Sequence, residues 1–437
     1  MSNHTKNFNL FFSLTISSLL YTLNASAITM LDAIAAAKNN SPILKQMALQ
    51  KDIALEQMKM AKSDMLPSLS TSFSYNYNDM NNPEMMQGSS SSSLGQFSTS
   101  ISMPIFTGFA ASTRYKMATI GIESRRLSQE QSLVDLVAQV KKIYLSALTI
   151  KRSLMAAELA VTNLEAHLLD AKKLYADGMI SKDDVLKSEV GLANSKQSSR
   201  IIKTEMKSIV ASLNILMGQP ITSEIEFDDA SDSVDWTEKN QGVYKSEIVD
   251  LDVDDLIMSA EMRRAEIKLM EKSVAKSDLA IKLAESGYYP TVSLTANHNE
   301  SYNFPDHSRS EFIGVMVNWK IFDWGKTRSQ VRSSKLEKEI ILSQYKNIID
   351  NIRLEVHNAY IEALLAYENI DAAKVTLAQS KESWSLTNEL YKQGRTTSTE
   401  VLQAQSSYTQ AESSYYATYF GYKIAMTSLN RAIGKKE

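Results

Sequence analysis

The chain has 437 residues, a formal net charge of −3, 43% hydrophobic residues and no cysteine. This length is enough to bury a sizeable core, but the near-neutral charge gives no electrostatic support for a nucleic-acid partner, which would require a basic surface. The lack of cysteine excludes disulfides, cysteine metal ligands, thiol nucleophiles and an acylated amino-terminal cysteine.

Residues 1–27 have the features of a secretory signal peptide. Lys6 supplies a positive charge, residues 10–23 are mostly apolar, and Ala25-Ser-Ala27 is a small-residue cleavage site. A membrane anchor is the alternative, but it needs about 20 apolar residues, and polar side chains interrupt this shorter run. We therefore expect cleavage after Ala27 and an exported protein. No later stretch resembles a transmembrane helix, so entry into a membrane would require strands.

Helical spacing over 30–38 and 42–65 is followed by a pair of strands at about 67–106. In each strand, apolar or aromatic residues alternate with serine and other small polar residues, and the polar stretch 78–96 reads as a loop. Each strand is about 10 residues, the length that crosses a bilayer when tilted, and apolar-out, polar-in alternation is typical of transmembrane barrels. A half-buried sheet in a soluble domain has the same period and is the alternative.

A long helical hairpin is predicted over 110–218, with its turn at Gly178 and a capping box at Ser181-x-x-Asp184. Its first helix would reach roughly 100 Å at 1.5 Å per residue. Apolar residues recur every seven positions, which is coiled-coil spacing. They are Leu133, Val140, Ala147, Leu154, Val161, Leu168 and Tyr175, with Ile150, Ala157, Leu164 and Ala171 beside them.

The unit 28–218 is then repeated. A shift of 216 residues, without a gap, relates the turn 174–186 to 390–402 and Gly218 to Gly434. An acidic segment, 219–250, joins the copies. The second repeat, 251–437, contains helices over 251–286, a strand pair at about 290–322 around a loop at 301–310, and a long hairpin over 325–434. That hairpin turns at Gly394 and has a second predicted capping box, Thr397-x-x-Glu400. Such a register indicates a duplicated structural unit.

Four strands cannot close a barrel, for which about eight are needed, and lipid does not tolerate open sheet edges. We therefore expect the chain to oligomerise, as a dimer with eight strands or a trimer with twelve.

No catalytic motif is present, whether a glycine-rich phosphate loop, G-x-S-x-G or H-E-x-x-H. The adjacent Asp183 and Asp184 at a helix start are more typical of capping than of acid–base chemistry. The histidines are scattered without metal-ligand spacing, at His4, His167, His298, His307 and His357. We predict a protein that is not an enzyme and uses no cofactor or metal.

The order of helix pair, strand pair and long hairpin, given twice, resembles the TolC family of outer-membrane efflux channels. The resemblance covers 28–437, and its most specific pieces are Pro-Ile-Phe-Thr-Gly (104–108), Ile-Phe-Asp-Trp-Gly-Lys (321–326) and the two hairpin turns. It implies a mainly α fold with membrane β structure. The homotrimer would form a 12-stranded transmembrane β-barrel, continued by an α-barrel of long helical hairpins in the periplasm, with 219–250 in an equatorial belt.

The resemblance also assigns roles at the turns. Asp184, Glu400 and Gln403 match residues that constrict the periplasmic aperture, where Gln403 replaces an acidic residue of some members. Tyr391 matches a latch tyrosine, although Thr396 stands where that latch has arginine. The tips that would dock a periplasmic adaptor are at Gly178, Met179, Gly394 and Arg395.

The sequence thus predicts a passive exit duct in the outer membrane of a Gram-negative bacterium. It would serve a tripartite efflux or type I secretion system, pass drugs or secreted proteins, and work with an adaptor and an inner-membrane ABC or RND pump. The alternative is a periplasmic coiled-coil adaptor or structural protein, which would have one hairpin flanked by compact β-domains.

Overall fold

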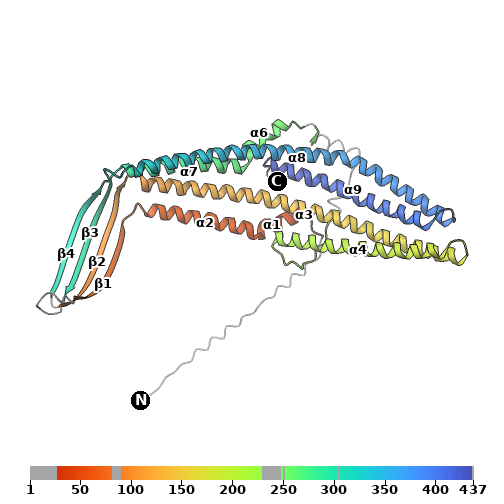
Figure 1. The fold of residues 1–437 in the computed structure, drawn as a ribbon, viewed down its shortest axis with the longest axis horizontal. Helices are drawn as coiled ribbons and strands as arrows, with labels where there is room; N and C mark the ends of the chain where they lie inside the picture. The colour runs from red at the N-terminus through yellow and green to blue at the C-terminus, as the bar shows by residue number, and fades with distance from the viewer. Residues whose placement is uncertain (1–26, 81–89, 229–247, 250, 304–305, 436–437) are drawn as a thin grey trace, which may run out of the picture.

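The computed structural model describes residues 27–80, 90–228, 248–249, 251–303 and 306–435. The predicted signal peptide, except Ala27, and most of the segment 219–250 lie outside these residues. The described chain is elongated, with a β-sheet at one end and two helical hairpin tips at the other (Figure 1). No helix within the described residues is both long enough and apolar enough to cross a membrane.

The secondary structure occurs twice, with nearly equal lengths. The first set is α1 (Met30–Asn40), α2 (Pro42–Ser63), β1 (Ser68–Met80), β2 (Ser90–Thr107), α3 (Ala110–Ala176) and α4 (Lys182–Met217). The second is α6 (Val253–Arg263), α7 (Ala265–Glu285), the short 3-10 helix η1 (Ser286–Tyr288), β3 (Thr291–Asn303), β4 (Asp306–Asn318), α8 (Lys326–Lys392) and α9 (Ser398–Ala432). Helices α3 and α8 have 67 residues each, and α4 and α9 have 36 and 35. These lengths are those expected of a duplicated unit.

The four strands form one antiparallel sheet in the order β1-β2-β3-β4. They are longer than predicted, because β1 and β2 extend to Met80 and from Ser90, within the range 78–96 that was expected to be a loop. The loop predicted at 301–310 was also wrong at both ends, since β3 runs to Asn303 and β4 starts at Asp306. A strand ladder is held by backbone hydrogen bonds, so polar side chains do not end it.

Strand β4 ends at Asn318, four residues before the predicted end of the second pair. The reason lies in the turn that follows. The Asp323 carboxylate accepts hydrogen bonds from the backbone N–H groups of Gly325 at 3.0 Å and Thr327 at 2.8 Å, at the start of α8. This cap turns the chain from strand to helix.

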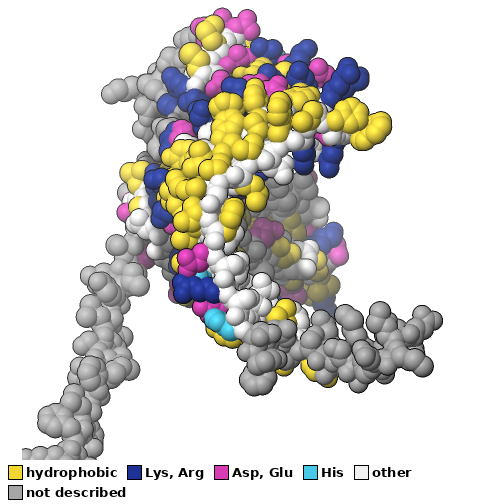
Figure 2. Space-filling model, turned by 90° about the vertical axis from the view of Figure 1, so that its left-hand side faces the viewer, with side chains coloured by type: hydrophobic (Ala, Val, Ile, Leu, Met, Phe, Trp, Pro, Cys, Tyr) yellow, Lys and Arg dark blue, Asp and Glu magenta, His cyan; other side chains and the backbone are white. Residues whose placement is uncertain are grey.

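The two faces of the sheet differ in chemistry. One hydrogen-bonded row places Leu69, Ile101, Ala296 and Ile313 side by side. The adjacent row lies on the opposite face and consists of Ser70, Ser100, Asn297 and Phe312, so it is polar on all strands except β4. The apolar face is exposed in the single chain, with Ile313 at 80%. Figure 2 shows it as a broad apolar patch that gives way to charged side chains and histidine towards the strand turns.

The long helices lie side by side and extend away from one end of the sheet. Contacts place α3 between α4 and α9 in the hairpin half, and between α2 and α7 in the half nearer the sheet, with α8 beside α9 and α7. The outer edges of this layer are therefore α4 and α2 on one side and α8 on the other.

The predicted heptad seam is only partly right in α3. Val140 and Ala147 are completely buried, but Tyr175 is 47% exposed, and the neighbouring series through Leu164 and Ala171 is buried instead. An α-helix has 3.6 residues per turn, so a seven-residue series drifts around the helix unless the pair supercoils. In α8 the series holds better, with Val356, Ala363, Ile370 and Tyr391 all buried.

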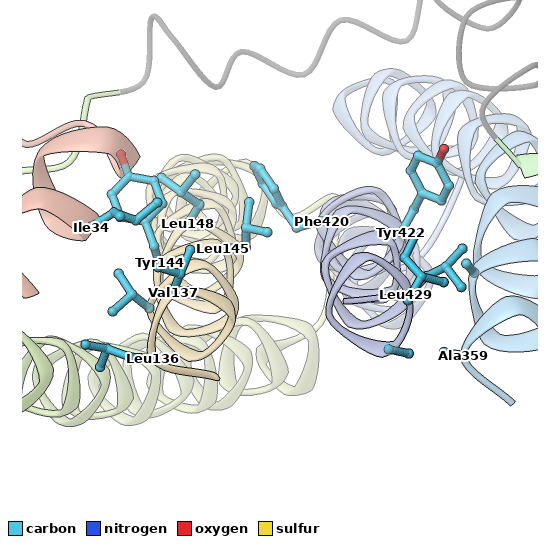
Figure 3. Close-up of a cluster of buried hydrophobic side chains, with 14 of the residues drawn as sticks. Ile34, Leu136, Val137, Tyr144, Leu145, Leu148, Ala359, Phe420, Tyr422 and Leu429 are labelled. Atoms are coloured by element: carbon cyan, nitrogen blue, oxygen red, sulfur yellow. The ribbon is translucent and has the colours of Figure 1, made fainter. Parts of the chain in front are cut away.

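The main hydrophobic core lies between the sheet and the hairpin tips, where α1, α3, α4, α8 and α9 meet near their middles or ends. We call this region the equator. Figure 3 shows Leu145 and Phe420 between α3 and α9, Leu148 next to Tyr144 on α3, and Tyr422 and Leu429 on the opposite side of α9, towards α8. The Tyr144 hydroxyl donates a hydrogen bond to the Ile28 carbonyl at 3.0 Å, which fixes the start of the described chain to α3.

Candidate functional site at the hairpin tips

The first tip joins α3 to α4 through Gly178, which has a φ of 72°. Glycine tolerates this left-handed conformation, which commonly ends a helix. The Met179 N–H donates to the Leu174 carbonyl at 2.9 Å. This carbonyl lies in the last turn of α3, where carbonyl groups have no partner within the helix. Ser181 and Asp184 form the predicted capping box, in which each side chain accepts a hydrogen bond from the backbone N–H of the other residue.

The second tip repeats this turn at Gly394, with a φ of 69°. Its cap is weaker than predicted. The Thr397 side chain accepts a hydrogen bond from the Glu400 N–H at 3.4 Å, but within this described tip the Glu400 carboxylate returns none to Thr397. The exposed Glu400 carboxylate stays in solvent, so only half of the second capping box is present.

The two tips lie together at the end of the molecule opposite the sheet (Figure 1). A Cβ atom on Gly394 would lie 3.3 Å from the terminal methyl of Met179, so the turns are in contact. Met179, Arg395, Glu400 and Gln403 are exposed, whereas Asp184 is half-buried. Tyr391 differs from all of these, because only 1% of it is exposed.

Tyr391 belongs to a buried cluster that we call the polar junction, defined as His167, Ser188, Tyr391 and Ser398. The Ser398 hydroxyl donates to the Tyr391 hydroxyl at 2.8 Å, and the Ser188 Oγ lies 3.2 Å from both the Ser398 Oγ and the His167 Nε2. The ring centroids of His167 and Tyr391 are 4.4 Å apart. The four residues come from α3, α4, α8 and α9, so the junction joins the two hairpins.

Burial dominates the electrostatics of the junction. It lowers the pKa of His167 to about 4, against a partial opposing effect of Asp170. It also raises the pKa of the Tyr391 hydroxyl, and the negative charges of Asp184 and Asp170 act in the same direction. Both side chains are therefore neutral at pH 7.

A second polar link lies on the sheet side of the junction. The Asn163 side-chain amide of α3 donates to the buried Gln405 of α9 at 3.1 Å. Nearby, α4 approaches α9 so closely that a Cβ on Gly191 would lie 2.5 Å from a methyl of Leu402. Gly191 therefore allows this helix contact because it has no side chain.

No sequence motif indicated a role for His167, Ser188, Ser398 or Gly191. A signal for His167 was present, since it falls three residues after Leu164 and four before Ala171, on the buried stripe of α3. Its partners come from three other helices, so no local sequence pattern indicated the junction as a whole.

The sheet has one apolar and one mostly polar face and is continued by long helical hairpins. A family model described as outer membrane efflux protein matches residues 33–219 and 256–435. The chain belongs to this family. It is an outer-membrane efflux or secretion channel of Gram-negative bacteria, so the predicted class, location and lack of enzymatic activity are confirmed, and the alternative of a periplasmic adaptor is not supported.

Individual relatives are distant in sequence. The outer membrane protein TolC of Vibrio cholerae is 20% identical, over 96% of this chain and 94% of that protein. The probable efflux pump outer membrane protein TtgC of Pseudomonas putida is 22% identical, over 75% and 71%. The solved CmeC outer membrane channel of Campylobacter jejuni has the same fold, with a TM-score of 0.75 at 15% identity over 99% of this chain and 94% of that one.

Proposed function

We propose that the chain works as a homotrimer that forms a passive exit duct, with a 12-stranded barrel in the outer membrane and a periplasmic tunnel of helices. The observation that carries this proposal is that the two outer edges of the single chain complement each other. A head-to-tail ring of identical copies joins such unlike edges and leaves none open.

The sheet supports the barrel. Its outer strands, β1 and β4, each have a partner on one side only, and open edges are not tolerated in lipid. The apolar band also crosses the hydrogen-bonded rows obliquely. On β1 it continues past Leu69 to Phe73, whereas on β4 the residue in the Phe73 row is Arg309. Strands tilted by about 35–45° in a barrel produce this slant, because a row then rises through the membrane.

The helical edges carry matching apolar ladders. On α8, Leu386, Val375 and Ile361 lie 6, 17 and 31 residues before the tip end of the helix at Lys392. On α4, Val190, Ile201 and Ile215 lie 8, 19 and 33 residues after its tip end at Lys182. All six side chains are between 47% and 60% exposed in the single chain. The two ladders therefore have the same spacing and differ in height above the tips by only two residues, about 3 Å, which a contact between neighbouring copies can accommodate.

Cysteine cross-linking tests this contact directly, because the chain has no cysteine of its own. In outer membranes from cells expressing Ile361→Cys with Ile215→Cys, oxidation should give covalent trimers on a non-reducing gel. Each single variant should stay monomeric after denaturation. Glu362→Cys with Ile215→Cys is the matched control, since this exposed neighbour is turned by about 100° around the helix and should cross-link poorly. Equal cross-linking of both pairs, or none, would contradict the trimer.

At the tips, we propose that Asp184 and Glu400, with Gln403, line the periplasmic aperture, and that Tyr391 helps to hold it closed. Repeated around a trimer axis, such acidic residues would form rings that attract cations. The exposed turns at Gly178, Met179, Gly394 and Arg395 would dock a periplasmic adaptor. An inner-membrane ABC or RND pump would supply the energy, and similarity to a probable efflux pump outer membrane protein supports a pump partner.

Single-channel recording tests the aperture. Replacing both Asp184 and Glu400 with Ala should raise conductance in planar bilayers and weaken block by multivalent cations. Asp184→Asn with Glu400→Gln should do the same with less disturbance of the caps. Asp183→Asn is the control, because this neighbouring carboxylate is exposed and already paired with Lys187 at 2.6 Å. A conductance unchanged in all acidic variants would refute the aperture assignment but leave the trimer standing.

The remaining organisation follows from this duct. Residues 1–27 would direct export and be removed, and 28–218 and 251–437 would be equivalent repeats around the tunnel. The segment 219–250 would pack outside the helices as part of an equatorial belt. Its described end supports this position, because Phe227 forms a bridge with Ile28 and contacts the ring of Tyr144 on α3.

A further inference from the structure

The polar junction is more than a structural contact, because its central side chain can change charge. We propose that His167 is a proton-sensitive pin between the two hairpins of one chain: neutral, it holds the tips together, and protonated, it releases them. This inference rests on the proposed function, since release of the tips would widen the aperture.

The pin occupies the point where four helices meet. His167 on α3 is 3% exposed, Ser188 on α4 is 1%, Tyr391 on α8 is 1% and Ser398 on α9 is completely buried. Solvent therefore cannot compensate a polar group that loses its partner here. Any change in the hydrogen-bonding needs of His167 acts directly on the contact between the hairpins.

The network determines which nitrogen carries the proton in the neutral ring. Ser188 has one hydroxyl proton, and two acceptors compete for it, the Asp184 carbonyl at 2.9 Å and the Ser398 Oγ at 3.2 Å. The His167 Nε2 is then the donor to the Ser188 Oγ at 3.2 Å. In this tautomer Nδ1 carries only a lone pair. This nitrogen is buried without a hydrogen-bond partner, which is tolerable for an acceptor.

Protonation would place a second N–H on Nδ1, and a buried charged donor without an acceptor is costly. The groups that face the ring do not remove this cost. Asp170, on α3 itself, favours the charged ring but is 3.6 Å from Lys173. The Asp184 carboxylate of α4 is held in the capping box, while α8 and α9 present the neutral hydroxyls of Tyr391 and Ser398. The charged ring is accommodated most easily by separating the hairpins and admitting water.

The sign of the pH dependence follows from burial. The pKa of His167 is about 4 in the closed tip and is expected to approach its ordinary 6.5 once the ring is solvated. The open tip then binds more protons, so closure is favoured above pH 6.5 and is weakened as the pH falls towards 4. Between pH 7.5 and 5 the ratio of closed to open tips should fall by roughly 30-fold through this one group.

Spin-label distances test the release without relying on conduction. Met179→Cys and Arg395→Cys in the full-length, otherwise cysteine-free trimer would place one label on each tip of a chain. Double electron–electron resonance should give a narrow distance distribution at pH 7.5, and a longer, broader one at pH 4.5. His167→Gln should keep the narrow distribution at both pH values, because an amide donates to Ser188 without titrating. His357→Gln, at an exposed histidine of α8, is the control and should behave as the parent chain.

Ser188→Ala provides a second variant if His167→Gln does not assemble. It removes the acceptor of the Nε2 proton and should broaden the distances already at pH 7.5. The proposed role of His167 would be contradicted by a distance distribution that does not change with pH in the parent chain. A distribution that still broadens at low pH in His167→Gln would contradict it as well. Because the labels report tip separation in any oligomer, a failed trimer or aperture test would be seen independently.

Discussion

Two regions join the hairpins, and they use opposite chemistry. At the equator, α3 and α9 pack through large apolar side chains such as Leu145 and Phe420, inside an extensive buried cluster. At the tips, the apolar cluster of the described residues is small, with Ala171, Tyr391 and Val401 as its fully buried members, and buried hydrogen bonds of the polar junction contribute to the contact. Apolar packing is strong and non-directional, whereas a buried hydrogen-bonded network fails when one partner changes. The equator is therefore suited to holding the chain together and the tips to opening.

The two duplicated tips also differ from each other. Tyr175 and Tyr391 are equivalent under the 216-residue shift, yet one is 47% exposed and the other 1%. The difference arises because Tyr391 meets His167 and Ser398, while Tyr175 has no such neighbours in the described structure. Duplication supplied two similar turns, and their environments gave them different properties.

The largest effect is expected at the equator. Leu148→Ala removes a side chain that is 2% exposed within the main core, and it should cost about 2–5 kcal/mol of stability through lost burial and a cavity. Thermal unfolding followed by circular dichroism in detergent measures the loss. Leu159→Ala, at a 45% exposed position of the same helix, is the matched control. A similar loss for both variants would mean that the equator is not the main source of stability.

A smaller and more local effect is expected for Gly191→Ala. The new methyl would lie 2.5 Å from a methyl of Leu402, so this side chain has to move and the packing between α4 and α9 is disturbed, at a cost of about 1 kcal/mol. Hydrogen–deuterium exchange should increase at both tips and stay unchanged at the equator. Leu402→Ala in the same chain should restore protection by making room. Faster exchange at the equator as well would show that the two regions are not independent.

The smallest effects separate the two caps. Ser181→Ala removes a reciprocal capping box and should cost about 1 kcal/mol. Thr397→Ala removes a single, longer hydrogen bond and should cost less. Amide exchange in the first turns of α4 and α9 measures each loss. Equal increases would indicate that the second box also closes in solution.

Much of the fold could be predicted because it is local and repeated. The helix bounds follow from Pro67, Gly178 and Gly394 and from capping residues, and alternation marked the strands. The strand ends were missed because the backbone ladder continues through polar residues that resemble a loop. The seam of α3 was partly missed because its burial depends on the drift of the helix relative to its neighbours.

Part of the candidate site at the tips was predicted and part was missed, because only local features can be read from the sequence. Asp184 and Glu400 were found because they lie close to a recognisable turn. The polar junction was not, since its members are up to 231 positions apart, from His167 to Ser398, and their burial depends on how four helices meet.

The sequence by itself determined the duplicated plan, the channel class, and the separation of an apolar-faced sheet from long helical hairpins. These features depend on periodicity and turn chemistry, which act within a few residues. Only the tertiary structure decided that Tyr391 and not Tyr175 is buried, that His167 lies in the contact between hairpins, and that α4 and α2 lie at one edge of the helical layer and α8 at the other. These depend on burial and on distances between helices, which no local pattern specifies.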